Sequence, residues 1–392
     1  MALEEKITDA VERGYAFTVV TGPTKSGKSV LCRRVLGDRN LVAIEGGQIR
    51  SEADFWSHMG YQLNVASAAT KGRADTSTTT AAAEGGGGVP GIFQAKGGGS
   101  QSEARQTTSS LTYNNVTVIA AISRLLETQS VLMVDDFHYI DKDSQKAIIR
   151  ALKGAVFKGL PVFLLAVPHR AFDPLIVESE VEGRFKHVPM PQWALDDLLQ
   201  IPGSGFPALN VQVERSLQRR ICEDSFGNPL LVQEICSEFC LKNKVREAQS
   251  TPLTLDAKLL EPTYKEMAES KGLPTYSKLR AGPTGRRARQ VRRMRYGGEE
   301  NIFTAVLASV ARLGPKSNSS LDDIRTSLRE VLAADASIPQ RAEIISGLVN
   351  MSNVARERIQ GDPPLEWIEG DSTLVITDPF LLFYLKWSFR NQ

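Results

Sequence analysis

The segment that most restricts the fold of this chain lies near its start, where residues 22–29 read GPTKSGKS. An apolar run, residues 16–20, precedes the segment, and residues 30–35 have helical character, so the local order is strand, turn and helix. The segment matches the pattern GxxxxGK[ST] in full, which is the pattern of a phosphate-binding loop. Its glycines let the backbone curl so that N–H groups point inward, and the helix that follows adds partial positive charge there. We therefore expect an α/β fold in which this loop binds the phosphates of a nucleotide.

The chemistry of the loop predicts ATP bound together with Mg²⁺. Lys28 can reach the β and γ phosphates, and the Ser29 hydroxyl can ligate the metal ion. The alternative is a chance match after an unrelated turn, but the strand before it, the helix after it and an acidic strand end farther along favour the loop. The residues expected to contact the nucleotide are Gly22, Pro23, Thr24, Lys25, Ser26, Gly27, Lys28, Ser29 and Val30.

An acidic pair follows a second apolar run. Residues 131–134 are apolar without alternation, which is typical of a strand covered on both sides. Asp135 then lies at the carboxyl edge of the sheet, where open α/β sheets bind ligands, and we predict that it holds Mg²⁺ through water. Asp136 is the candidate that polarises the attacking water, although a glutamate would reach farther, so slow hydrolysis is expected. The alternative for Asp136 is that it only caps the next turn.

Strands and helices alternate through the first half of the chain, which predicts a parallel sheet between helices. After residue 193 the pattern becomes helical, and from 299 three helices followed by an apolar ribbon predict a winged-helix domain. The expected domains are a P-loop ATPase core at 1–192, a helical lid at 193–243, a basic linker at 244–298 and a winged helix at 299–392. Expected elements of the core are strands at 41–44, 162–167 and 186–189 and helices at 52–63, 145–157 and 175–184. Beyond the core, we expect helices at 194–200, 211–224, 230–241, 302–313, 321–332 and 340–349, and a hairpin-like stretch at 365–383.

The core is interrupted by a segment of unusual composition at about 66–110. It consists mainly of Ala, Thr, Ser and Gly, and Ile92 and Phe93 are its only sizeable apolar residues. Such a segment cannot bury enough surface to offset its backbone entropy. We interpret it as a mobile surface insertion.

The order of these motifs resembles the AAA+ superfamily over roughly residues 15–241, and within it the STAND group of signalling ATPases. Gly227-Asn228-Pro229 is similar to the GxP motif of that group, and the Asp135-Asp136 ending also occurs there. The resemblance implies that Pro229 contacts adenine. It also implies self-association on ATP binding and a nucleotide state that controls assembly with a separate effector protein, as in prokaryotic defence. The C-terminal residues 377–384 resemble the closing motif of archaeal and bacterial P-loop ATPases that end in a winged helix, where the aromatic residues pack the last helix.

Two arginines occupy positions that such ATPases use for catalysis. Arg170 follows the third strand and is the candidate sensor of the γ phosphate, with a plain surface arginine as the alternative. Arg184 precedes the fifth strand and is the candidate arginine finger toward a neighbouring subunit, with a solvated side chain as the alternative. His138 lacks a cysteine or second histidine nearby, so we expect a hydrogen-bonding role and no metal site.

A basic cluster leaves a second function open. Acidic residues are absent from 271 to 298, and a cluster of arginines could bind phosphate backbones, in which case affinity would depend steeply on salt. Nucleic acid, a contact with a protein or within the chain, and no specific role all remain open. The second reading of the chain is thus a DNA-binding AAA+ ATPase, like replication initiators or transposition regulators. The cluster consists of Arg286, Arg287, Arg289, Arg292, Arg293 and Arg295.

Composition sets the remaining limits. The four cysteines form no CxxC pair and no zinc spacing with the four histidines, so free thiols in a reducing compartment are expected. No apolar run reaches the roughly 18 residues of a membrane helix. We expect a cytoplasmic protein without a membrane contact.

Overall fold

A computed structural model gives the structure of the chain. It forms two compact units, Met1–Gly22 with Lys28–Met190, and Pro23–Gly27 with Pro191–Gln392. Among the residues that it describes, no helix is long and apolar enough to cross a membrane. The described residues are 3–37, 39–65, 118–168, 183–285, 289–359 and 361–389. The predicted insertion at 66–110 and the predicted helix at 175–184 therefore lie largely or wholly outside them.

The first unit is built on a five-stranded parallel sheet in the order β2-β3-β4-β1-β5. Strand β4 lies between β1, which leads into the phosphate loop, and β3, which ends at Asp135. The carboxyl ends of β1, β4 and β5 are level, since Thr21 pairs with Ala166 and Pro189. The strands are β1 (Phe17–Thr21), β2 (Leu41–Glu45), β3 (Val131–Asp135), β4 (Val162–Ala166) and β5 (Phe185–Pro189).

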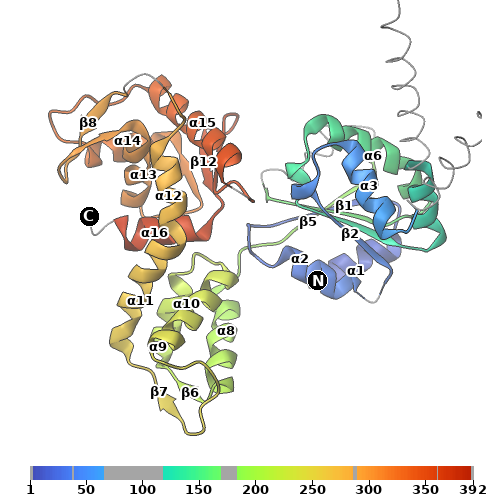
Figure 1. The fold of residues 1–392 in the computed structure, drawn as a ribbon, viewed down its shortest axis with the longest axis horizontal. Helices are drawn as coiled ribbons and strands as arrows, with labels where there is room; N and C mark the ends of the chain where they lie inside the picture. Colours follow the sequence, from blue (N-terminus) through green and yellow to red (C-terminus); the bar gives the residue numbers. More distant parts are fainter. Residues whose placement is uncertain are drawn as a thin grey trace, which may run out of the picture. The chain divides into compact units, whose positions relative to one another are not determined.

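Helices cover both faces of this sheet because alternate strand residues point to opposite sides. Val19 and Val134 face one core, which contains residues of α3, α6 and the helix at 118–127, while Val20 and Met133 face the other, with α1 and α2. Figure 1 shows these helices on the two faces. The α/β P-loop fold predicted from the sequence is confirmed. The helices are α1 (Leu3–Arg13), α2 (Lys28–Leu36), α3 (Glu52–Gln62) and α6 (Lys142–Val156).

The second unit begins with the helical lid. The first lid helix was expected to stop at Gln200, yet it continues through Pro202 and Pro207. Pro202 and Phe206, one turn apart, are both buried, so packing of this face outweighs the unfavourable helix propensity of proline. The lid elements are α8 (Leu195–Ala208), β6 (Val211–Gln212), α9 (Arg215–Glu223), α10 (Pro229–Lys242) and β7 (Leu253–Thr254).

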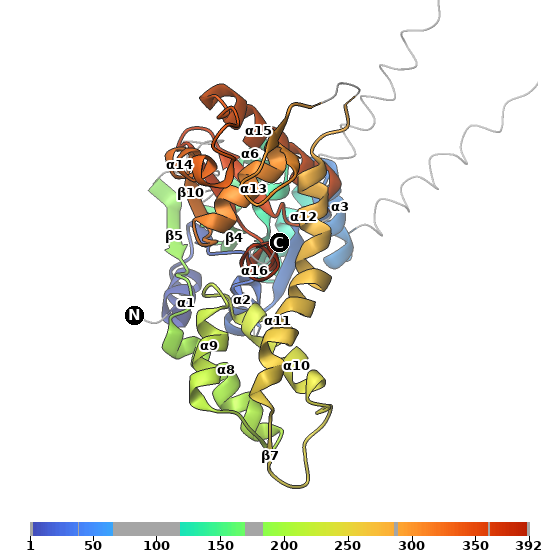
Figure 2. The same cartoon turned by 90° about the vertical axis from the view of Figure 1, so that its left-hand side faces the viewer.

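The range 244–298, expected as a basic linker, is largely folded. Helix α11 (Leu260–Met267), a π-helical stretch (Ala268–Gly272) and helix α12 (Leu273–Ala281) follow one another without a break. This long helical run is visible in Figure 2. Its side chains Tyr264 and Tyr276 are buried in the core that the lid shares with the winged helix. The sequence suggested a linker because Pro, Gly and arginine dominate it, but the spaced aromatic residues supply the packing.

The winged-helix domain follows, with a β10-β12-β11 sheet beside its helices. Helix α15 ends nine residues later than expected, since the buried Met351 and Val354 extend its packed face. The expected hairpin ends at Ile376, and the last aromatic residues form a helix, α16, instead. The elements are β8 (Val291–Arg293), β9 (Glu299–Asn301), α13 (Ile302–Arg312), β10 (Asn318–Ser320), α14 (Leu321–Val331), α15 (Arg341–Arg358), β11 (Leu365–Ile368), β12 (Thr373–Ile376) and α16 (Pro379–Trp387).

Candidate nucleotide-binding site

The phosphate loop joins the carboxyl end of β1 to the first turn of α2. The N–H of Gly22 donates to the carbonyl of Ala166 at 3.3 Å, which fixes the start of the loop beside β4. Lys28 is the first residue of α2 and is only 6% exposed, and its Nζ donates to the carbonyl of Gly22 at 3.0 Å. Ser29 lies in the same first turn. The side chain of Lys28 is thus folded back across the loop, where a phosphate anion would meet it.

Several features of the loop fit a bound polyphosphate. The hydroxyls of Thr24 and Ser26 are buried and have no hydrogen-bond partner among the described residues. Gly27 has φ +93°, a conformation that favours glycine, and a Cβ built on it would meet no atom within 4 Å. Buried hydroxyls without partners are costly unless a ligand or water satisfies them. The residues present therefore fit a nucleotide whose phosphates lie in this loop.

Asp135 lies at the same edge of the sheet as the loop. Through β4, the register places it level with Val20 of β1, and two strand spacings separate them, about 10 Å. Burial, and then the negative charge of Asp135, raise the pKa of the Cys32 thiol to about 12, against the lowering effect of the Lys28 ammonium. Both charged groups are therefore near the same side chain of α2. A cation between Asp135 and the Ser29 hydroxyl would have oxygen ligands of the kind Mg²⁺ prefers.

Asp136 has an unusual backbone. Its φ of 50° and ψ of 40° lie in the left-handed region, and its N–H donates to Oδ1 of Asp135 at 3.1 Å. Its side chain makes no capping hydrogen bond to the following 3₁₀ turn, Phe137–Tyr139. Strained backbone of this kind often occurs where a side chain must be aimed. The role of Asp136 in polarising water stays a prediction.

The absence of a side chain at Gly46 allows a close approach to the Asp135-Asp136 backbone from the neighbouring strand end. A Cβ at Gly46 would lie 2.4 Å from the carbonyl oxygen of Asp136 and 2.9 Å from that of Asp135. We expect Gly46→Ala to displace this backbone, to lower stability by about 1–3 kcal/mol and to reduce turnover about tenfold or more. The adjacent Gly47→Ala is the control, because its Cβ would meet only the Tyr139 ring, at 3.9 Å. Melting temperature and ATP turnover check both variants, and equal behaviour of the two would show that the close approach is unimportant.

The other predicted site residues are placed differently. Arg170 lies outside the described residues. Arg184 precedes β5 at the sheet edge opposite the phosphate loop, where it donates to the Tyr15 carbonyl at 3.4 Å and stacks over the Phe157 ring at 4.2 Å. It therefore cannot serve the phosphate loop of its own unit, and a role toward a neighbour stays a prediction. Pro229 is the first residue of α10, as the expected motif requires.

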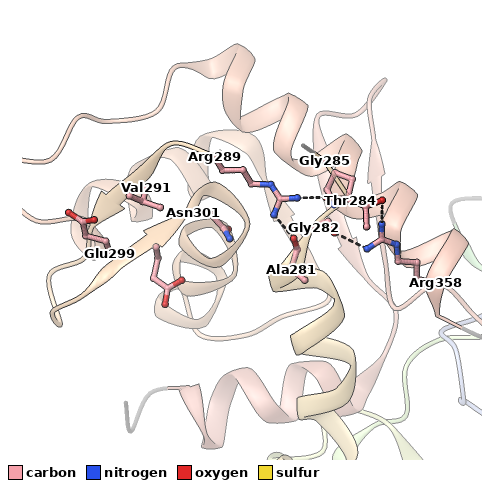
Figure 3. A pocket seen from close by; sticks show the side chains of 11 residues that line it. Ala281, Gly282, Thr284, Gly285, Arg289, Val291, Glu299, Asn301 and Arg358 are labelled. Carbon is pink, nitrogen blue, oxygen red and sulfur yellow. Dashed lines mark hydrogen bonds between the residues drawn. The ribbon is translucent and has the colours of Figure 1, made fainter. Parts of the chain in front are cut away.

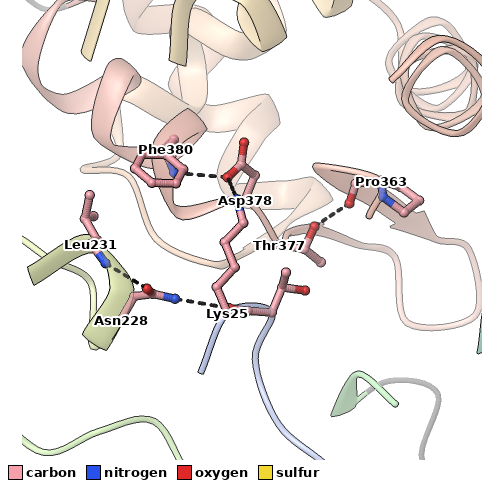
Figure 4. A network of polar contacts seen from close by, with 8 residues as sticks. Lys25, Asn228, Leu231, Pro363, Thr377, Asp378 and Phe380 are labelled. Carbon is pink, nitrogen blue, oxygen red and sulfur yellow. Dashed lines mark hydrogen bonds and ion pairs between the residues drawn. The ribbon is translucent and has the colours of Figure 1, made fainter. Parts of the chain in front are cut away.

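The sequence did not predict which residues hold the tip of the loop, Pro23–Gly27. In the second unit, Asn228 Nδ2 donates to the Thr24 carbonyl at 3.0 Å, and Trp193 Nε1 donates to the Ser26 carbonyl at 2.9 Å. Lys25 forms an ion pair with Asp378 at 3.0 Å (Figure 4). The Asn-Pro pair signalled a helix start, but no sequence pattern reveals a donor to a carbonyl 204 residues away.

No family model matches the sequence, and no curated protein is similar to it. The fold is similar to the Walker-type ATPase PABY2304 of Pyrococcus abyssi, with a TM-score of 0.54 and 16% identity over 98% of this chain and 94% of that one. Cdc6p of Pyrobaculum aerophilum has a TM-score of 0.42 and 11% identity over 97% and 93%. The Orc1 protein of Aeropyrum pernix, solved in complex with DNA, has a TM-score of 0.45 and 10% identity over 90% and 82%. The chain thus has the fold of Walker-type P-loop ATPases.

Proposed function

We propose that the chain binds ATP with Mg²⁺, hydrolyses it slowly and uses the nucleotide state to control assembly with a separate protein, as a STAND-type switch does. The ion pair between Lys25 and Asp378 carries the proposal. Lys25 belongs to the phosphate loop, and Asp378 is the N-cap of α16 in the winged-helix domain. The Phe380 ring lies 4.7 Å from the Lys25 ammonium and adds a cation–π contact (Figure 4). A residue of the phosphate loop is therefore bound to the C-terminal domain.

Through this ion pair, nucleotide binding can affect the winged-helix domain. The Lys25 ammonium carries a single positive charge, and in this structure it is paired with Asp378. A triphosphate in the loop brings negative charge that competes with Asp378 for this ammonium. ATP binding would then weaken the hold of the loop on α16, and phosphate release would restore it. Self-association on ATP binding, with Arg184 toward a neighbour, belongs to the same proposal.

DNA binding is the second candidate, because a winged helix is a common DNA-binding fold. The contacts of the arginine cluster support DNA binding less than the composition of the cluster suggested. Arg292 is 4% exposed in its side chain and pairs with Glu343 at 2.7 Å, and Arg293 pairs with Asp335. Arg286 and Arg287 lie outside the described residues. The four described members, Arg289, Arg292, Arg293 and Arg295, all contact groups of their own domain.

Arg289 is an example of an arginine of the cluster that binds groups of its own domain. Its guanidinium donates to the carbonyls of Ala281 and Pro283 and lies 4.9 Å over the Phe303 ring. Arg358 donates to the Gly282 carbonyl at 3.0 Å from the other side, so two arginines hold the turn after α12 (Figure 3). Guanidinium groups used in this way stabilise the domain, and their orientation is set by partners within it.

The charged residues on the surface of the winged helix also argue against DNA binding. The three arginines of α15 are engaged, since Arg341 pairs with Asp322 and Arg356 with Glu366, and Arg358 holds the turn. The turn between β11 and β12, residues 369–372, carries two acidic residues and no basic one. DNA affinity depends on cations that can neutralise phosphates. A protein is therefore better supported than DNA as the binding partner of this domain.

The proposal is tested by Asp378→Asn. Asparagine keeps the cap of α16 but removes the negative charge, so Lys25 becomes available to phosphate without first leaving a partner. The pair is partly exposed, and we expect ATP affinity to rise about 2- to 5-fold. Titration with a fluorescent ATP analogue measures it.

Two further variants complete this test. In a Lys25→Met background, Asp378→Asn should have no effect, because the interaction is already absent. Asp371→Asn, on the exposed turn between β11 and β12, is the matched control and should leave affinity unchanged. Unchanged or weaker ATP binding by the Asp378 variant would exclude competition between Asp378 and phosphate.

A further inference from the structure

We infer that Asn228 and Trp193 are positioning residues for the phosphates, acting through the carbonyl groups of the phosphate loop. The inference rests on the proposed nucleotide binding and adds how the lid sets its affinity. Both residues belong to the lid side of the second unit, and their side-chain N–H groups donate to the carbonyls of Thr24 and Ser26. Neither needs to touch the nucleotide.

The geometry of the peptide bond explains why these contacts matter. In a planar trans peptide the C=O and the following N–H point in opposite directions. A donor that holds the Thr24 carbonyl therefore orients the N–H of Lys25 the opposite way, and a donor on the Ser26 carbonyl does the same for the N–H of Gly27. Phosphate loops bind anions with such N–H groups. Because the two carbonyl groups belong to residues two positions apart, the two hydrogen bonds orient two of these N–H donors.

Asn228 is fixed for this task by its second hydrogen bond. Its Oδ1 accepts from the N–H of Leu231 at 3.1 Å, as the N-cap of α10, so the amide orientation leaves Nδ2 for the loop. The side chain is only 6% exposed, and the preceding Gly227 has φ +71°, with Gln192 and Trp193 against it. The lid helix and the loop are thus connected by one rigid amide. The Thr24 carbonyl, without this donor, would be a buried acceptor with a lost partner.

The two functions of Asn228 can be separated by substitution. Serine caps helices about as well as asparagine but is too short to reach the loop, whereas alanine loses the cap as well. We expect both Asn228→Ser and Asn228→Ala to weaken ATP binding about 10- to 100-fold. Asn228→Ser should unfold at a higher temperature than Asn228→Ala, because serine keeps the cap and both variants lose the hydrogen bond to Thr24. Trp193→Phe keeps a ring but removes the indole N–H, and it should weaken ATP binding in the same range. Gln233→Ala, elsewhere on α10, is the control for a general change in the lid.

Competition by inorganic pyrophosphate distinguishes positioning of phosphates from contact with the base. Pyrophosphate should displace a fluorescent ATP analogue from wild type, and its own affinity should fall in the Asn228→Ser variant by a similar factor. If only ATP affinity falls while pyrophosphate affinity is unchanged, the residue contacts the base and the inference is wrong. Wild-type affinity for ATP in the Asn228→Ser and Trp193→Phe variants would also overturn it. A wild-type protein that binds ATP no better than its Lys28→Ala variant would instead show that the proposed nucleotide binding has failed.

Discussion

Lys28→Ala is expected to weaken ATP binding by about 100-fold or more, since it removes a buried cation from the phosphate site. The ammonium lies across the loop on the Gly22 carbonyl, in the first turn of α2. We expect its side chain to move from this carbonyl to the β and γ phosphates of bound ATP without a change of backbone. The other lysine of the loop, Lys25, is paired with Asp378 and would have to leave this partner to compensate.

Titration with a fluorescent ATP analogue measures this effect, and the melting temperature without nucleotide shows whether the variant is folded. Lys158→Ala, on an exposed position of the same unit, is the control and should bind as wild type does. Equal affinity of wild type and the Lys28 variant, with both folded, would mean that this loop is not the nucleotide site.

Asp136→Asn is expected to leave ATP binding within about twofold of wild type and to reduce turnover about 100-fold or more. Asparagine tolerates the left-handed conformation that Asp136 adopts, so the backbone should keep its place. The amide cannot accept a proton from water as a carboxylate can. The proposed metal ligand Asp135 is unchanged in this variant, so binding should be retained.

Steady-state phosphate release and the ATP titration together check this variant. Asp143→Asn, an exposed acidic position at the start of α6, serves as the comparison and should change neither quantity. Normal turnover in the Asp136 variant would leave that residue with a structural role only.

Local sequence patterns were sufficient to predict the ATPase fold. The uninterrupted apolar residues of β3 indicate a buried strand, and the glycines of the loop indicate a tight turn. The position of Asp135 at the end of β3 then follows from the strand assignment. Sequence patterns did not predict the helices whose extent depends on tertiary packing. Helix α8 continues past Pro202 because Phe206 is buried one turn later, and α11 and α12 form within a basic range because Tyr264 and Tyr276 are buried.

The site could be predicted only as far as it is local. Gly22 to Ser29 is contiguous, and Asp135 follows from the end of a strand. The contact of Lys25 with Asp378 joins residues 353 positions apart, and no single-sequence pattern encodes it. The arginine cluster shows the opposite problem, since its composition suggested phosphate binding while Arg292 is buried on Glu343. Charge composition reveals nothing about which partners within the domain a charge will find.

Calorimetric titration of the wild-type protein with ATP shows whether the chain binds the nucleotide on which all the proposed roles depend. Our proposal predicts one ATP per chain, bound through the loop from Gly22 to Ser29. Binding should be tighter with Mg²⁺ than with EDTA if, as we propose, Ser29 and Asp135 supply oxygen ligands for the metal ion. Saturable 1:1 binding that weakens when Mg²⁺ is removed is the predicted result. No saturable binding of ATP in the presence of Mg²⁺ would contradict the account.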